Sequence, residues 1–264
     1  MIHVIAMLLQ TGATDLWTEE RHPWLFELAR WGPYALGALL LFLVAKALVR
    51  QRRYRALSVL GDRDQAAVHA ALADAEKRTV GEIVPVVLER SDEHAGARWT
   101  CALVTLLACS TLLEAHLSWT QPHWLLLEQL GFGALGYGLA WLLPDLQRVF
   151  VSEARAGEMA EEQALQEFHR LGLHRTAGRT GVLLFVSLFE RRVIVLGDEG
   201  VASKVNEGHW VETREHVLAG IRRGSLAHGL VEGIRASGKV LAEHHPWTDG
   251  DRNELPDRLV VRQR

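Results

Sequence analysis

Cysteine and the short signatures of several enzyme classes are scarce in this chain. Only two of its 264 residues are cysteine, Cys101 and Cys109. On one helix they would lie about 12 Å apart along the axis, which is too far for a disulfide bond. The sequence has no CxxC pair, no P-loop and no GxSxG motif. These absences leave no basis for a thioredoxin-like redox centre, a cysteine-based zinc site or a serine hydrolase elbow.

The chain also lacks an excess of either charge. Its 29 lysines and arginines stand against 32 aspartates and glutamates, which gives a formal net charge of -3. No basic stripe is present, so the sequence gives no support for a nucleic-acid partner.

Charge is almost absent from three long apolar runs, residues 32–49, 100–117 and 124–143. Each has about the length of a helix that crosses a bilayer, roughly 20 residues. Residues 118–123 contain no lysine or arginine, whereas four arginines follow the first run within residues 50–55. Because basic residues are retained in the cytoplasm, we predict three transmembrane helices with the N-terminus outside and the C-terminus in the cytoplasm.

Residues 1–31 form an arm before the first run. Trp17, Trp24 and Trp31 recur every seven residues, which places them on one face of a helix. We therefore expect the arm to lie on the outer leaflet. Its apolar start lacks the basic region and cleavage site of a signal peptide, so we expect it to stay on the mature chain.

The two remaining segments, 56–98 and 145–261, alternate helical and strand patterns. Strands are expected at 81–90, 181–188 and 192–198, and helices at about 62–78, 146–171, 209–222 and 226–244. The first two strands are joined by a crossover and should be parallel neighbours, while the third should pair antiparallel with the second. Pro85 indicates an edge or a bulge in the first strand. The pattern predicts one α/β domain with a small mixed sheet, split by an inserted transmembrane hairpin.

Four motifs resemble the TPM domain family, and in particular its bacterial membrane branch. They are RTVGEIVP at 78–85, TGVLLFVSLFERRVIVLGDEG at 180–200, the pair His209 and Trp210, and HHPWTDGDRNELPD at 244–257. The resemblance covers residues 56–98 and about 150–261. It implies a Rossmann-like three-layer sandwich, which we expect on the cytoplasmic side of a multi-pass protein of the bacterial inner membrane. The family also includes thylakoid proteins of photosystem II repair, an auxiliary receptor subunit, calcium-binding members and plant members with a claimed acid-phosphatase activity.

Acidic side chains in two predicted loops form a candidate metal site. The first loop supplies Asp198 and Glu199, and the closing segment supplies Asp249, Asp251, Asn253 and Glu254. Hard oxygen ligands at alternating positions are typical of the start of a calcium loop, although the sixth and twelfth positions differ from an EF-hand. If the two loops meet at one end of the sheet, they can bind calcium or magnesium. The alternative is a set of solvated turn and capping residues.

Two further polar clusters have both a functional and a structural interpretation. His209, Glu212 and His216 share one helix face, which suits either a transition-metal site or a solvated surface. The other cluster surrounds the outer end of the predicted hairpin and consists of Glu114, His116, His123 and Glu128. These side chains could bind an ion, sense pH or simply be wetted at the membrane interface.

The glycine motif GFGALG at 131–136 matches the dinucleotide fingerprint but lies inside a predicted span. We therefore expect no nucleotide cofactor. A stripe of Gly131, Ala134 and Gly138 is instead predicted to let the hairpin helices approach closely.

Ser91 and Ser187 have no activating partner in the sequence, so nucleophilic catalysis finds little support. The sequence predicts an integral membrane protein that acts as a non-catalytic accessory, assembly or repair factor for membrane protein complexes. Its expected partners are the lipid bilayer and a membrane protein. The alternative is an acid phosphatase that uses a divalent metal to activate water.

Overall fold

The computed structural model describes residue 45 and residues 54–114, 122–249, 254–255 and 258–262. The chain divides into two units, Met1–Val49 and Arg50–Arg264. The predicted arm at 1–31 lies outside the described residues, as does the first predicted span except for Ala45, which is helical.

A four-stranded mixed sheet forms the centre of the α/β domain, in the order β3-β2-β1-β4. Strand β1 (Glu82–Leu88) pairs parallel with β2 (Gly181–Ser187), and β2 pairs antiparallel with β3 (Arg192–Gly197). The predicted parallel pairing of the first two strands and the predicted antiparallel pairing of the second and third strands are therefore confirmed. The short strand β4 (Val260–Arg262) adds parallel to β1 on its other side.

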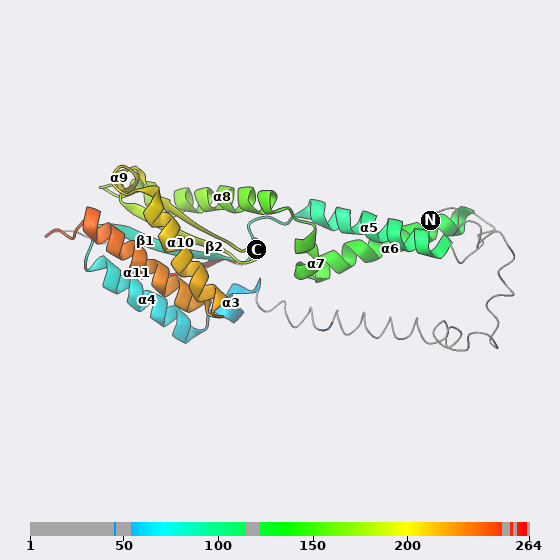
Figure 1. Ribbon diagram of the computed structural model, residues 1–264, viewed down its shortest axis with the longest axis horizontal. Helices are drawn as coiled ribbons and strands as arrows, with labels where there is room; N and C mark the ends of the chain where they lie inside the picture. The colour runs from blue at the N-terminus through cyan, green and yellow to red at the C-terminus, as the bar shows by residue number, and fades with distance from the viewer. Residues whose placement is uncertain (1–44, 46–53, 115–121, 250–253, 256–257, 263–264) are drawn as a thin grey trace, which may run out of the picture. The chain divides into compact units, whose positions relative to one another are not determined.

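Helices cover both faces of this sheet and complete three layers (Figure 1). On one face lie α4 (Asp62–Glu76), α10 (Glu207–Arg222) and α11 (Leu226–His244), and α8 (Glu153–Arg170) covers the other. The apolar side chains alternate along β1 and β2: Ile83 and Val87 pack towards α4 and α11, whereas Val84 and Val86 pack towards α8. The period-2 pattern of a strand therefore supplies two cores at once.

Short helices connect these elements. They are α3 (Ala56–Val59), α7 (Pro144–Val149), the 3-10 helix η3 (Leu173–Arg175) and α9 (Glu199–Ala202). The predicted single helix at 146–171 is wrong, because the chain breaks between α7 and α8. Ser152 caps the start of α8 by accepting a hydrogen bond from the Arg155 amide at 3.2 Å.

Pro85 does not mark an edge strand, because β1 lies between β2 and β4. Strand β4 pairs only with Val86, Val87 and Leu88. No residue of β4 pairs with Pro85. The N–H that proline lacks would point towards β4, so its absence removes no hydrogen bond from the sheet.

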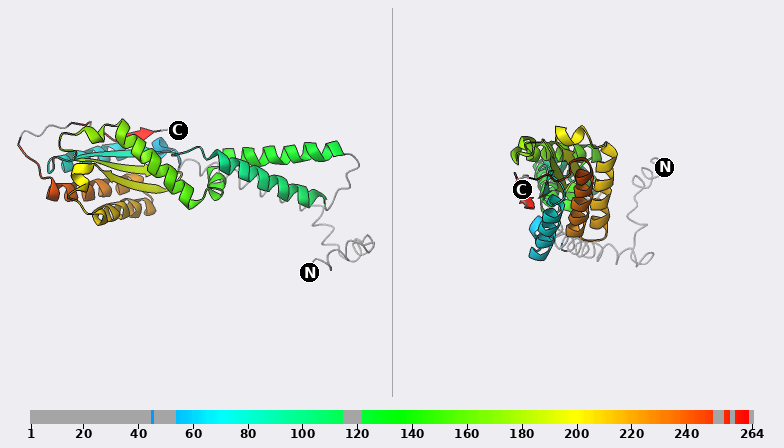
Figure 2. Two further views of the ribbon diagram at one scale, coloured as in Figure 1. Left: turned by 90° about the horizontal axis from the view of Figure 1, so that it is seen from above. Right: turned by 90° about the vertical axis from the view of Figure 1, so that its left-hand side faces the viewer.

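A helical hairpin is inserted between β1 and α7. It consists of α5 (Ala95–Glu114) and α6 (Pro122–Leu142), which lie side by side in Figures 1 and 2. Among the described residues one helix, over Leu125–Leu142, is long and apolar enough to cross a membrane, and 11% of this window is buried. The predicted runs at 100–117 and 124–143 fall on α5 and α6, apart from residues 115–117, which lie outside the description.

The close approach between the hairpin helices occurs at a different glycine from the one expected. A Cβ atom on Gly136 would lie 2.6 Å from Thr105 Oγ1 and 2.9 Å from the Cys101 carbonyl oxygen. Gly131 and Gly138 have no heavy atom within 4 Å of such a Cβ atom. The predicted stripe of Gly131, Ala134 and Gly138 is therefore wrong as the contact surface, and Gly136 is the position that requires glycine.

Candidate functional site

The structure places the acidic candidates at the amino end of the parallel strands. The Asp198 amide donates to the Gly181 carbonyl at 2.9 Å, which holds the end of β3 beside the start of β2. The Glu254 amide donates to Glu82 Oε1 at 2.9 Å, at the start of β1. Asp198 and Glu254 thus belong to the same end of the sheet. Asp249 is exposed in a turn, and Asp251 and Asn253 lie outside the described residues.

Two of these acidic groups already have partners. Glu199 forms an ion pair with Arg179, and both carboxylate oxygens of Glu254 accept from the Ala177 amide, at 3.2 and 3.0 Å. Asp198 Oδ2 is buried and has no hydrogen-bond partner in the described part of the chain. Within that part, no three His, Cys, Asp or Glu side chains converge as a metal site would require. The described residues alone therefore do not form a cation site.

Gly200 explains why the GDEG motif ends in glycine. A Cβ atom at this position would lie 2.4 Å from the Gly178 carbonyl oxygen and 2.7 Å from that of Arg179. Any side chain would separate α9 from the loop that precedes β2. This motif is therefore explained by packing at the amino end of the sheet.

The other polar candidates are dispersed. His209, Glu212 and His216 line a depression between α10 and α11, where His216 Nε2 lies 3.7 Å from Glu212 Oε1. Glu128 lies within α6, and neither of its carboxylate oxygens has a hydrogen-bond partner among the described residues. Glu114 is the last residue of α5, and His123 lies at the start of α6. His116 lies outside the described residues.

A buried polar network occupies the opposite, carboxyl end of β1 and β2. The Glu190 side chain is completely buried, in the tight turn between β2 and β3. Its carboxylate accepts hydrogen bonds from the Ser91 amide at 3.0 Å, the Asp92 amide at 3.4 Å and the Ser187 hydroxyl. His94 Nε2 lies 2.7 Å from Glu190 Oε1. The carboxylate therefore ties the loop after β1 to the hairpin of β2 and β3.

This network contains serine, histidine and a carboxylate, but its geometry is not that of a catalytic triad. The Ser187 hydroxyl and the His94 ring both point to the same Glu190 carboxylate, rather than forming a serine–histidine–acid chain. Ser91 and Ser187 are 5% and 1% exposed. A substrate would have to open the core to reach either hydroxyl, so the network serves to hold the loop.

Opposing effects act on the pKa of Glu190. Burial raises the pKa, while the hydrogen bonds from His94, Ser187 and the Ser91 amide lower it, and the net result is a pKa below the ordinary value of 4.5. Glu190 is therefore a buried anion whose charge is stabilised by its donors. Phe189 is itself fully buried and stacks on the His94 ring, with 5.2 Å between the ring centroids.

A partly apolar groove runs along β3 in the described part of the α/β domain. Its floor consists of the consecutive residues 193–197, and its walls come from α8 and α10. Leu165 is 52% exposed on the first wall and Val211 is 45% exposed on the second, beside Trp210. The groove encloses about 680 Å³. Its length along a strand suits an extended peptide.

The floor of this groove has free hydrogen-bonding groups. The Asp198 amide bonds to Gly181, and antiparallel ladders alternate bonded and non-bonded pairs. The backbone N–H and C=O groups of Leu196 and Ile194 therefore face β2. Those of Gly197, Val195 and Val193 point to the outer edge. No described strand pairs with that edge. An unpaired edge of this kind is a template for a further strand.

The sequence did not indicate this groove. A continuous apolar run such as that of β3 is typical of a strand buried on both faces. Five of the six residues of β3 are nevertheless only partly buried, because β3 is an edge strand in the described sheet. Nor did the sequence indicate Glu190, whose charge in a short turn suggested solvent.

Comparison with known proteins agrees with the motifs. Residues 145–240 match the family model of the TPM domain. No curated protein matches the chain. Among solved structures, the chain is similar to protein BA42 of the psychrophilic bacterium Bizionia argentinensis, determined by NMR. The two are 21% identical, with a TM-score of 0.49, and the match covers 78% of this chain and 98% of BA42. The family match confirms the resemblance to the TPM domain family, and the chain carries a TPM domain at residues 145–240; the bacterial membrane branch stays a prediction.

Proposed function

We propose that this chain is a membrane-anchored accessory protein whose TPM domain binds an extended segment of a membrane-protein partner along β3. The observation that supports this proposal is the groove, whose floor is the unpaired edge of β3 and whose sides are two helices. An added strand gains backbone hydrogen bonds along the edge, while its alternate side chains enter the space between the two walls.

The hairpin supports the membrane part of the proposal. Large apolar side chains are exposed along both helices, and they include Leu103, Leu107, Leu126, Leu127 and Leu130, each at least 56% exposed. In water this surface would be a strong aggregation site, whereas in a bilayer it is the ordinary lipid-facing surface. Three aromatic residues, Trp99, Tyr137 and Trp141, lie at the end of the hairpin that is connected to the α/β domain. Aromatic residues are enriched in this way at a membrane interface.

The buried network supports a non-catalytic role. The serines that could act as nucleophiles are enclosed and donate to Glu190 or to each other. The phosphatase alternative would need metal-bound water, and it has no complete ligand set among the described residues. We propose that the TPM domain is a binding module on the cytoplasmic side of the bacterial inner membrane, and the basic residues near the first predicted span support this side.

Proline at position 195 tests the strand-docking role. Val195 does not donate to β2, so Val195→Pro removes an outward N–H while leaving the ladder intact. Val195→Thr is the matched control, because it keeps both the N–H and the side-chain volume. Each backbone hydrogen bond contributes about 0.5–1.5 kcal/mol, so the loss of one bond and the blocked approach should weaken binding at least severalfold.

The assay is affinity purification of the full chain from membranes, with identification of the proteins that co-purify. The proposal expects a membrane protein that is retained by the wild type and by Val195→Thr but lost with Val195→Pro. The same proteins with all three chains would refute docking at β3. Phosphate release by the purified chain that disappears in Asp198→Asn would instead favour the phosphatase alternative.

A further inference from the structure

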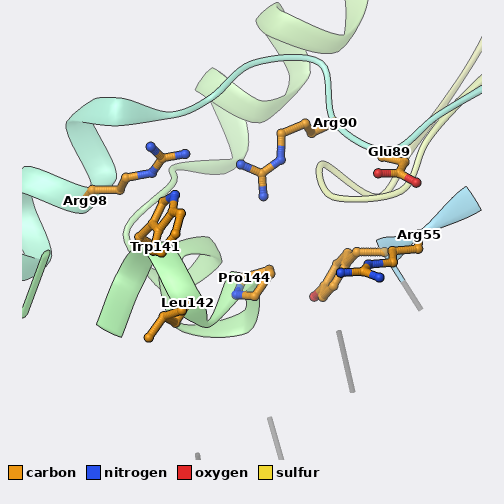
Figure 3. Close-up of a pocket in the computed structure, with 8 residues that line it drawn as sticks. Arg55, Glu89, Arg90, Arg98, Trp141, Leu142 and Pro144 are labelled. Atoms are coloured by element: carbon orange, nitrogen blue, oxygen red, sulfur yellow. The ribbon is translucent and has the colours of Figure 1, made fainter. Parts of the chain in front are cut away.

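A second, chemically different pocket lies where the hairpin joins the α/β domain. It has a volume of about 370 Å³. Its polar lining comes from Tyr54, Arg55, Glu89, Arg90 and Arg98, and its apolar lining comes from Trp141, Leu142 and Pro144 at the end of α6. Figure 3 shows the guanidinium groups of Arg90 and Arg98 pointing into the same space, with Trp141 beside Arg98.

The two arginines have little charge compensation. In the described part of the chain, neither Arg90 nor Arg98 has a carboxylate within the distance of an ion pair, and Arg98 Nε is buried without a hydrogen-bond partner. Arg90 instead lies over the Phe189 ring, 4.8 Å from its centroid. Burial lowers the pKa of the Arg90 guanidinium, and repulsion by Arg98 adds to this effect. Two guanidinium groups that face the same space repel each other, which favours an anion between them.

The acidic neighbours do not supply that anion. Glu89 is the one carboxylate among the residues that line the pocket, and its Oε1 accepts from the Ala56 amide at 3.0 Å. Glu190, Glu93 and Glu89 all favour the charged form of Arg90, but none of them forms an ion pair with it in the described part of the chain, and Glu190 is surrounded by its own donors. Arg90 and Arg98 together outnumber the one glutamate of the lining, which leaves this side of the pocket positive.

The surroundings indicate what kind of anion fits. A guanidinium presents parallel N–H donors that match the oxygens of a phosphate. Trp141 is 63% exposed at the rim of the pocket, next to the exposed apolar side chains of α6. A ligand that is anionic at one end and apolar at the other would satisfy both parts of the pocket. If the hairpin lies in the bilayer, the pocket stands at the level of the lipid headgroups.

We propose that Arg90 and Arg98 bind a phosphate oxyanion in this pocket, and that a phospholipid headgroup supplies it. The inference rests on the membrane anchoring proposed above, but it is independent of the β3 groove. A bound lipid would fix the hairpin against the TPM domain, because Arg90 follows β1 and Arg98 belongs to the first turn of α5.

The test compares the full-length wild type with Arg90→Gln, Arg98→Gln and Arg98→Lys after reconstitution into nanodiscs that contain phosphatidylcholine and phosphatidylglycerol. Arg175→Gln is the matched control, since Arg175 is exposed at the other end of the sheet, before β2. The measurement is the amount of phosphatidylglycerol retained per protein after transfer to detergent. A juxtamembrane arginine contributes about 1 kcal/mol, so each glutamine variant should retain roughly fivefold less, while Arg98→Lys keeps part of the binding.

A second arm separates the two sources of phosphate. Inorganic phosphate is added to the delipidated chain in detergent, and its thermal midpoint is followed. A phosphate-dependent rise that Arg98→Gln removes, with lipid retention equal in all variants, would assign the pocket to soluble phosphate and overturn the lipid source. Equal lipid retention without such a rise would overturn the site altogether.

Alkaline carbonate extraction of membranes distinguishes failure of this inference from failure of the anchoring proposal. Release of the wild-type chain into the carbonate supernatant would refute the membrane anchoring. A wild-type chain that stays in the membrane, with lipid retention unaffected by the arginine substitutions, would refute the lipid pocket alone.

Discussion

Glu190→Gln should destabilise the α/β domain far more than its turn position suggests. The carboxylate receives two backbone amides, the Ser187 hydroxyl and His94 within a completely buried site. Glutamine keeps the shape, but its amide group can accept at only one atom and turns its own donors towards the others. We expect two donors to lose their acceptor, at about 1–3 kcal/mol each, and take about 3 kcal/mol as the total.

This loss should appear as a lower thermal midpoint of the purified full chain in detergent. For a domain of this size, each kcal/mol shifts the midpoint by roughly 2–4 °C, so Glu190→Gln should unfold roughly 6–12 °C below the wild type. The matched control is Glu158→Gln, since Glu158 is exposed and lies 3.8 Å from Arg155, and it should shift the midpoint by less than about 2 °C.

The pH dependence gives the same prediction an independent check. The folded pKa of Glu190 lies below its ordinary value of 4.5. A lowered carboxylate pKa contributes stability that is present above the unfolded pKa and is lost as the pH falls through the folded pKa. The wild type should therefore lose more stability than Glu190→Gln on acidification below about pH 4.5. A midpoint of Glu190→Gln within about 2 °C of the wild type would contradict the assignment of a buried, fully hydrogen-bonded anion.

The remaining predictions concern the membrane segment and the acidic loops. A reporter active only in the cytoplasm should give signal when fused after Arg264 and none when fused within residues 120–123; the reverse pattern would refute the three-span topology. Gly136→Leu should separate the hairpin helices and lower the thermal midpoint, whereas Gly138→Leu, which meets open space, should not. If residues 249–254 complete a cation site with Asp198, saturating calcium should raise the midpoint of the full chain by mass action, and Asp198→Asn should abolish that rise; an unchanged wild-type midpoint in calcium and in magnesium would refute the metal site.

Periodicity in the sequence predicted most of the sheet and its covering helices. The helix expected at about 62–78 corresponds to α4, whose helically spaced residues Val68, Ala71, Leu72 and Ala75 are buried. Strand β4 could not be predicted in the same way, because a three-residue strand at the end of the chain is too short to show alternation. The break before α8 did have a local signal, since Ser152 followed by Glu153 is typical of a helix start.

The candidate site was harder to predict because it depends on tertiary placement. Glu190 belongs to a turn in the sequence, but its charge is surrounded by donors from a loop about 100 residues earlier in the chain. Arg90 and Arg98 are ordinary basic residues beside a predicted span until the fold brings them to one pocket with Trp141. The groove on β3 exists because β3 is an edge, and the order of strands in the sheet is not contained in the pattern of any one strand.

Site-specific photocrosslinking in native membranes tests the central claim most directly. A photoreactive amino acid replaces Val211, which is exposed on the α10 wall of the β3 groove. The account predicts a crosslink to an extended segment of a membrane protein, which persists with Val195→Thr and disappears with Val195→Pro. A crosslink of equal yield with Val195→Pro, or no crosslink to a membrane protein from the otherwise wild-type chain, would contradict docking along β3.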